Sequence, residues 1–69
     1  METIRLREEY IRLGQALKAA GLVDSGVMAK IVIQNGEVLV NGQTELQRGK
    51  KLKDGDLVEY QGQQIKICS

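Results

Sequence analysis

The sequence has 69 residues, with ten Lys and Arg against nine Asp and Glu, and it carries a net charge of +1. A domain of this size builds a small core and leaves little room to enclose a deep pocket. The sequence has no His, Trp, Phe or Pro, and its single Cys, Cys68, excludes an intramolecular disulfide. No apolar run approaches the ~18–20 residues that cross a membrane, and the N-terminus is too charged for a signal peptide. We therefore expect a cytoplasmic protein.

The first 22 residues predict a strand followed by a helix. Ile4 and Leu6 alternate with polar neighbours, which is the pattern of a half-buried strand. A helix is predicted over residues 8–20. Its apolar stripe would consist of Tyr10, Leu13, Leu17 and Ala20, with Ile11 beside it. Gly14 weakens this helix by roughly 1 kcal/mol relative to Ala and leaves room for another element to approach. Gly21 is suited to end the helix in a left-handed conformation.

Residues 24–42 predict a second helix that leads directly into a hairpin. Asp24 and Ser25 are good N-cap residues, because a side-chain oxygen can accept from first-turn amides. Apolar residues at spacings of three and four form one stripe, with Lys30 on the opposite, polar side. The stripe consists of Val27, Met28, Ile31 and Val32. The helix would end at residues 35–36, and Asn41-Gly42 is a strong signal for a tight hairpin turn.

The remaining chain predicts short strands joined by turns. The expected strands cover residues 43–45, 57–60 and 65–67. Between the first two lies a loop, residues 46–53, which Leu46 and Leu52 would anchor in the core, and Asp54-Gly55-Asp56 is a turn cluster. The order of elements predicts an α+β fold, in which two short helices pack on one face of a small, mostly antiparallel sheet of four to five strands. With no linker or repeat, residues 1–69 are expected to form a single domain.

Positive charge is concentrated in the middle of the chain. Residues 12–53 carry seven basic side chains against three acidic ones, whereas the ends together carry three basic and six acidic. Four of the basic residues fall between Arg48 and Lys53, where they repel one another unless an anion is near. If this loop faces the same way as the second helix, the two form a basic rim beside a helix N-terminus, which suits phosphate. A solvated loop is the alternative, and Lys18 could equally interact with carbonyls at the end of its helix.

Catalytic constellations are nearly absent from the sequence. Without His, metal sites and nucleophile–base pairs lack their commonest member. Asp54 and Asp56 are explained by turn chemistry, and Cys68 has no partner base in its neighbourhood. Each Gly is explained as a turn, a cap or a close approach, and no phosphate-binding glycine motif is present. We therefore expect no enzyme, no cofactor and no metal site. With only Tyr10 and Tyr60 as aromatic residues, phosphate and shape recognition of a structured RNA is favoured over base stacking.

Several short motifs follow one another in an order that is typical of a known family. They are Arg12-Leu13 and Leu17, Gly21-Leu22, Ser25, Ala29-Lys30, Gly36, Val38-Leu39-Val40-Asn41-Gly42 and Gly55-Asp56. With these motifs the chain resembles the ribosomal-protein S-four-type RNA-binding domain, with its αL motif, over about residues 10–60. The Gly49-Lys50-Lys51-Leu52 run is similar to small stand-alone bacterial members. The resemblance implies binding of structured RNA, commonly ribosomal or transfer RNA, through the two helices and the adjoining loop.

The chain departs from this family at three positions. Members commonly open the first helix with Arg-Leu-Asp, where this chain has Gly14 as the third residue. They often carry basic residues on the second helix where this chain has Gly26 and Gln34. The charge of that helix is thereby reduced to Lys30, and most of the positive charge lies in residues 48–53.

We therefore predict a non-catalytic, ribosome-associated RNA-binding protein that acts as a monomer, with structured RNA and ribosomal components as partners. The predicted RNA-binding residues are Arg12, Lys18, Ser25, Lys30, Gln34, Asn35, Arg48, Lys50, Lys51 and Lys53. The acidic ends leave open a protein-interaction or scaffold module associated with the ribosome or with RNA-processing machinery. A third class, the ubiquitin-like sulfur carriers, needs a C-terminal Gly-Gly, whereas this chain ends Ile67-Cys68-Ser69.

Overall fold

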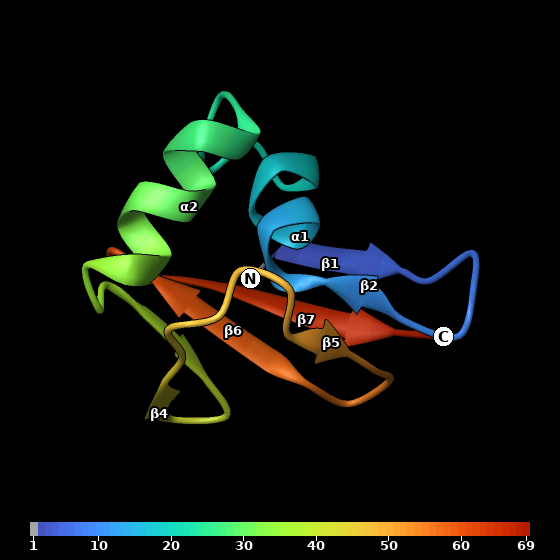
Figure 1. Ribbon diagram of the computed structural model, residues 1–69. Helices are drawn as coiled ribbons and strands as arrows, with labels where there is room; N and C mark the ends of the chain where they lie inside the picture. Colours follow the sequence, from blue (N-terminus) through green and yellow to red (C-terminus); the bar gives the residue numbers. More distant parts are fainter. Residues whose placement is uncertain (1) are drawn as a thin grey trace.

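Two short helices cover one face of a five-stranded sheet in the computed structural model, which describes residues 2–69 (Figure 1). The elements are β1 (Glu2–Arg5), β2 (Ile11–Arg12), α1 (Leu13–Ala19), α2 (Gly26–Gln34), β3 (Val38–Val40), β4 (Gln43–Thr44), β5 (Lys51–Leu52), β6 (Leu57–Tyr60) and β7 (Gln63–Cys68). The predicted α+β class is confirmed. Neither helix in the described part of the chain has the length and apolar content that spanning a membrane requires.

The main sheet has the strand order β1-β7-β6-β3-β4. Its neighbours are antiparallel except for β1 and β7, which pair in parallel, so the first and last strands of the chain lie side by side. The two remaining strands, β2 and β5, form a separate antiparallel pair in which Ile11 lies opposite Leu52 and Arg12 opposite Lys51. This small ribbon joins the basic loop to the start of α1.

Two hairpins close with two-residue turns whose backbone is left-handed. Asn41 and Gly42 have φ values of 53° and 82° between β3 and β4. Gln61 and Gly62 have φ values of 50° and 76° between β6 and β7. Positive φ at both positions is the type I′ geometry, whose twist matches that of the flanking strands. The hairpin predicted at Asn41-Gly42 is confirmed.

The core lies between the helices and the sheet. Strand residues alternate between the buried and the outer face, as in β7, where Ile65 and Ile67 are fully buried and their neighbours are not. The fully buried large side chains are Leu13, Leu17, Ile33, Val38, Leu52, Val58, Ile65 and Ile67. Leu52 therefore anchors the loop as predicted. The prediction for Leu46 was wrong, because this side chain follows the edge strand β4 and is 57% exposed.

The first helix begins at Leu13 and not at Glu8. Residues 11–12 are extended and pair with β5, and the N-cap residue Arg12 has φ −81° and ψ 149°. Residues 11–12 gain backbone hydrogen bonds to β5, whose Leu52 is fully buried. This pairing outweighs the helical pattern that begins at Tyr10. The end of α1 matches the prediction, because Gly21 has φ 74° and Leu22 N donates to Leu17 O at 3.0 Å.

Of the apolar stripe predicted for the second helix, Val32 faces the core and the other three residues do not. Val27, Met28 and Ile31 are 69%, 42% and 52% exposed, whereas the buried side is formed by Ala29, Val32 and Ile33. The physical reason is the close packing of the helices: an ideal Cβ on Gly14 would lie 3.7 Å from the Ala29 Cβ. Small residues on both helices allow this approach, so α2 turns its Ala29 side inward.

Candidate nucleic-acid interface

The basic loop folds back onto the first turn of α1. Leu13 N donates to Lys50 O at 2.8 Å, and Gly14 N donates to Arg48 O at 3.0 Å. A helix start leaves first-turn amides without intrahelical partners, and loop carbonyls supply those partners here. The loop is itself a tight turn, since Lys50 N donates to Gln47 O at 3.2 Å. The basic residues of the loop are thereby held against those of α1.

Arg12 joins the helix to the loop from the N-cap position of α1. Its Nη1 donates to Gly49 O at 3.0 Å, and its backbone N donates to Gln15 Oε1 at 3.2 Å. The Arg12 side chain is still exposed overall. One guanidinium edge is therefore fixed by the loop backbone, and the side chain remains accessible to a ligand.

Tyr10 lies beneath two cations at the β2–β5 ribbon. The Lys51 Nζ is 4.8 Å from the Tyr10 ring centroid, and the Arg12 Cζ is 5.6 Å from it. Arg12 and Lys51 are cross-strand partners, and like charges in that position repel. The electron-rich face of Tyr10 offsets part of this repulsion through cation–π attraction. Tyr10 thus packs beside Arg12 and Lys51 and does not belong to a helical stripe, which the sequence pattern alone did not reveal.

A pocket of about 500 Å³ lies along α1, between this helix, the start of α2 and the loop. It is lined by Arg12, Gly14, Gln15, Lys18, Gly26, Arg48 and Gly49. Three of the predicted RNA-binding residues, Arg12, Lys18 and Arg48, therefore meet at one concave site. Gln15 and the glycines were not predicted to belong to it. The sequence signals for Gly14 were the room that it leaves for another element and its place where members of the resembled family commonly have Asp.

Two lysines of the loop, Lys50 and Lys53, lie near the carboxylate of Asp56. Asn41 Nδ2 donates to Asp56 Oδ1 at 3.0 Å, and Lys53 N donates to Asp56 Oδ2 at 2.8 Å. Partial burial acts to raise the pKa of Asp56. These hydrogen bonds and the charges of Lys50 and Lys53 together lower it further than burial raises it, so the pKa of Asp56 lies below its ordinary value of 3.8. Asp56 partly neutralises this end of the loop.

The predicted residues of α2 lie at different points along that helix. Ser25 is the N-cap, and its Oγ accepts from Met28 N at 3.1 Å. Gln34 and Asn35 lie at the opposite end, about 12 Å along the axis from the helix start. Asn35 Nδ2 donates to Glu37 Oε2 at 3.4 Å. Lys30 lies between these ends and is exposed.

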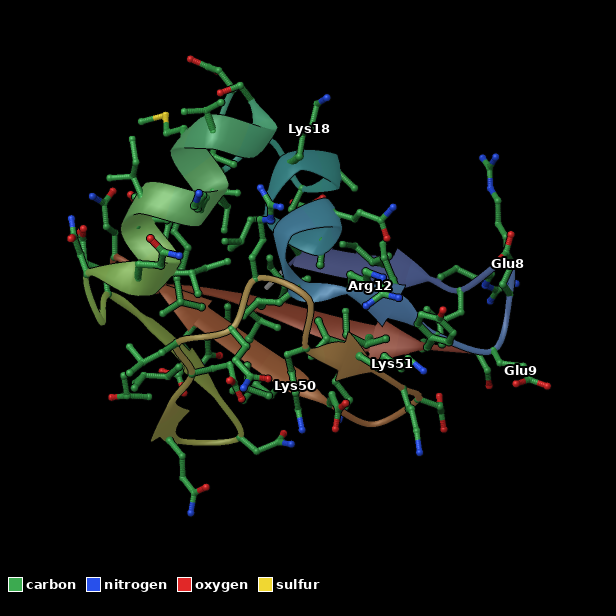
Figure 2. The ribbon with its side chains drawn as sticks, in the orientation of Figure 1. Glu8, Glu9, Arg12, Lys18, Lys50 and Lys51 are labelled. Carbon is green, nitrogen blue, oxygen red and sulfur yellow. The ribbon has the colours of Figure 1, made fainter. Side chains whose placement is uncertain are left out.

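The labelled charges separate along the molecule. Figure 2 shows Lys18 at the top of α1, Arg12 at its base and Lys50 and Lys51 below, whereas Glu8 and Glu9 lie at the far right-hand end. We call Arg12, Lys18, Arg48, Lys50 and Lys51 the basic surface. A second pocket, of about 510 Å³, has both charge signs among its lining residues, which include Arg5, Arg7 and Glu8. The basic surface is the stronger candidate for an anionic ligand.

No group of three or more metal-ligating side chains lies together within residues 2–69.

Comparison with known proteins identifies the family of this chain. The sequence pattern of the S4 domain family matches residues 4–68. Over 59 residues the chain is 48% identical to the "Probable ribosome maturation protein RlbA" of Bacillus subtilis, with 86% of this chain and 83% of the relative covered. Over 63 residues it is 31% identical to the "Putative RNA-binding protein YbcJ" of Escherichia coli, with 91% and 90% covered.

The solution structure of YbcJ is described as revealing an αL motif involved in RNA binding. The two structures superpose with a TM-score of 0.77 at 31% sequence identity, over 100% of this chain and 89% of YbcJ. The helices and the mostly antiparallel sheet expected from the resemblance are confirmed. The chain belongs to the S4 domain family and has the αL fold.

Proposed function

We propose that this protein binds structured RNA without catalysing a reaction on it, and that the basic surface is its RNA-binding face. The observation that carries the proposal is the docking of the loop on α1, which collects Arg12, Lys18 and Arg48 around one pocket. Lys50 and Lys51 extend the same surface below α1 (Figure 2). Such a cluster favours polyanions, because each neutralised phosphate releases condensed counterions.

The environment of the aromatic residues favours a folded RNA over a single strand. Tyr60 is only 5% exposed, and the ring of Tyr10 already faces two cations. Proteins that bind single strands without sequence preference use accessible aromatic faces on which bases stack. Among the described residues no free aromatic platform remains, so phosphate positions and RNA shape would carry recognition.

The names of the two relatives narrow the class of RNA. One is named as a ribosome maturation protein and the other as an RNA-binding protein. We infer that the RNA is ribosomal, with transfer RNA as the alternative, and that the protein acts during assembly or maturation of the ribosome.

The charge-reversal variant Lys50→Glu/Lys51→Glu tests the binding face. In a gel shift with ribosomal and transfer RNA fragments, we expect a loss of affinity of about 100-fold or more, because two phosphate contacts are replaced by repulsion. Lys30→Ala should cost less, about tenfold at most, because only one charge is removed and Lys30 lies on α2, outside the basic surface. The matched control is Arg5→Glu/Arg7→Glu, which changes the charge equally at the other pocket. Equal losses for both double variants would contradict the assignment of the face.

A protein-interaction module remains the second candidate, and the exposed side of α2 supports it. Val27, Met28 and Ile31 are neighbours on the helix surface, and Asp24 and Glu37 flank the helix ends. This combination suits a basic protein segment with apolar side chains, such as a ribosomal component would offer. Capture of ribosomal proteins that survives exhaustive nuclease treatment and is lost in Ile31→Asp would favour this function.

A further inference from the structure

The Arg48 side chain crosses α1 directly over Gly14. A Cβ placed on Gly14 would lie 2.6 Å from the Arg48 Cγ and 3.2 Å from its Cδ. The same Cβ would lie 3.7 Å from the Ala29 Cβ on α2, so the Arg48 stem runs in the seam between the two helices. Any residue larger than Gly at position 14 would displace this stem.

The backbone fixes the same two residues to each other. Gly14 N donates to Arg48 O at 3.0 Å, so the main chain of Arg48 cannot move away to relieve a clash. Gly14 is not among the residues with positive φ, and it lies within the helix. Glycine is therefore needed here for space and not for backbone conformation. A glycine within a helix lowers stability by roughly 0.5–1 kcal/mol relative to Ala. At position 14 it leaves the space that the Arg48 side chain occupies.

The pocket of about 500 Å³ that Arg48 lines has the residue composition of an anion-binding site. Arg48, Arg12 and Lys18 line it, and no carboxylate is among the residues that line it. Gly26 and Gly49 keep two further parts of its wall free of side chains. Arginine presents a planar fork of donors that matches phosphate oxygens, and an anion between the three cations would relieve their mutual repulsion.

We propose that this pocket binds one phosphate group of the RNA backbone, and that Gly14 is the positioning residue that holds Arg48 in it. The inference rests on the proposed RNA-binding function and deepens it. It assigns the pocket to one phosphate and leaves Lys50 and Lys51 to neutralise neighbouring phosphates. A pocket of about 500 Å³ also has room for the sugar next to that phosphate.

A double-mutant cycle in the complete chain tests the link between Gly14 and Arg48. Arg48→Ala should weaken binding of a ribosomal RNA fragment about tenfold or more, through loss of a charge-assisted phosphate contact. Gly14→Ala should cause a similar loss, because its methyl group displaces the Arg48 stem. In Gly14→Ala/Arg48→Ala the methyl group has room, so this variant should fold and bind as Arg48→Ala does. Losses that multiply in the double variant would overturn the positioning role.

The matched control removes an arginine outside this pocket. Arg7 is exposed and lines the other pocket. Arg7→Ala should therefore retain affinity within about twofold. Arg48→Lys should recover part of the loss seen in Arg48→Ala, since a charge without the planar fork remains.

Titration with inorganic phosphate separates this inference from the proposed function. In the unmodified protein, we expect backbone amide NMR shifts to change at Gly14, Gly26 and Gly49, and these changes should disappear in Arg48→Ala. Shifts spread evenly over the exposed lysines would overturn the pocket assignment even if the protein binds RNA. Conversely, failure to bind any structured RNA, with phosphate still bound in the pocket, would contradict the proposed function and not the phosphate site.

Discussion

Asn41 links two turns that are far apart in the sequence. Its φ of 53° allows the tight turn between β3 and β4, and its side chain contacts the turn before β6. Its Nδ2 donates to Asp56 Oδ1 at 3.0 Å, and its Oδ1 accepts from Leu57 N at 2.9 Å. The local turn at Asn41-Gly42 was predictable, because it depends on two adjacent residues. The contact with Asp56 was not, because it depends on the register between strands that no local pattern specifies.

The lowered pKa of Asp56 predicts how stability responds to acid. Because the folded-state pKa lies below 3.8, the native state favours the charged carboxylate, and its stabilising contribution is complete above that pH. The contribution is lost as the pH falls through the folded-state pKa. Asp56→Asn should therefore destabilise the protein at pH 7, by about 1–3 kcal/mol through its hydrogen bonds, and flatten the loss of stability below pH 4. Urea denaturation between pH 2 and pH 7 measures both effects.

Asp24→Asn provides the charge-matched control for this experiment, since it removes one exposed carboxylate outside the Asn41–Asp56 contact. An acid dependence that is unchanged in Asp56→Asn would contradict the role given to this carboxyl group.

At the scale of elements, the two helices show what periodicity can and cannot specify. The C-terminal ends of both helices were predictable, because Gly21 and Gly36 take a left-handed backbone. The start of α2 was predictable too, because Ser25 caps it through its own side chain. The buried side of α2 was not. Two overlapping apolar stripes are compatible with its sequence, and the choice between them depends on how closely α1 approaches. The start of α1 was missed for a related reason, because the ladder between β2 and β5 forms only in the folded chain.

The orientation of α2 predicts opposite outcomes at two neighbouring isoleucines. Ile33 is fully buried, so Ile33→Ala should cost about 2–5 kcal/mol of unfolding free energy. Ile31 is 52% exposed, and Ile31→Ala should change stability by no more than about 0.5 kcal/mol. Both variants make the same chemical change in the same helix, so thermal or urea unfolding compares them directly. A larger cost at Ile31 than at Ile33 would mean that α2 is rotated about its axis.

At the scale of the whole molecule, the basic surface lies along α1 and the loop, and Glu8 and Glu9 lie at the opposite end (Figure 2). The sequence predicted a basic middle and acidic ends, but Asp56, from an acidic end, lies near Lys50 and Lys53. It also predicted Arg48, Lys50 and Lys51 as candidates, because four basic residues fall within six positions. It could not predict that Arg12, Lys18 and Arg48 share one pocket, since hydrogen bonds between distant backbone groups bring them together.

This separation predicts a selective change in the salt dependence of RNA binding. For the unmodified protein, log affinity should fall linearly with log salt concentration, by about 0.7–0.9 for each phosphate neutralised. Lys51→Ala should reduce that slope by about one such unit, because one contact is lost. Glu9→Gln removes a charge of the other sign far from the basic surface and should leave the slope unchanged. Gel shifts at four or more salt concentrations measure the slope, and an equal change in both variants would argue against a localised interface.

The closure of the loop over the first turn of α1 limits how this protein can be altered. The carbonyls of Arg48 and Lys50 serve as the N-terminal cap of the helix, so the segment that would meet RNA is also part of the folding unit. An inserted residue between Arg48 and Lys50 would shift both acceptors and leave the amides of Leu13 and Gly14 without partners. Loop length is thus fixed by the helix, whereas the exposed side chains of Lys50, Lys51 and Lys53 can change without disturbing these hydrogen bonds. We therefore expect the RNA specificity of such a protein to change through substitutions in the loop and not through a longer loop.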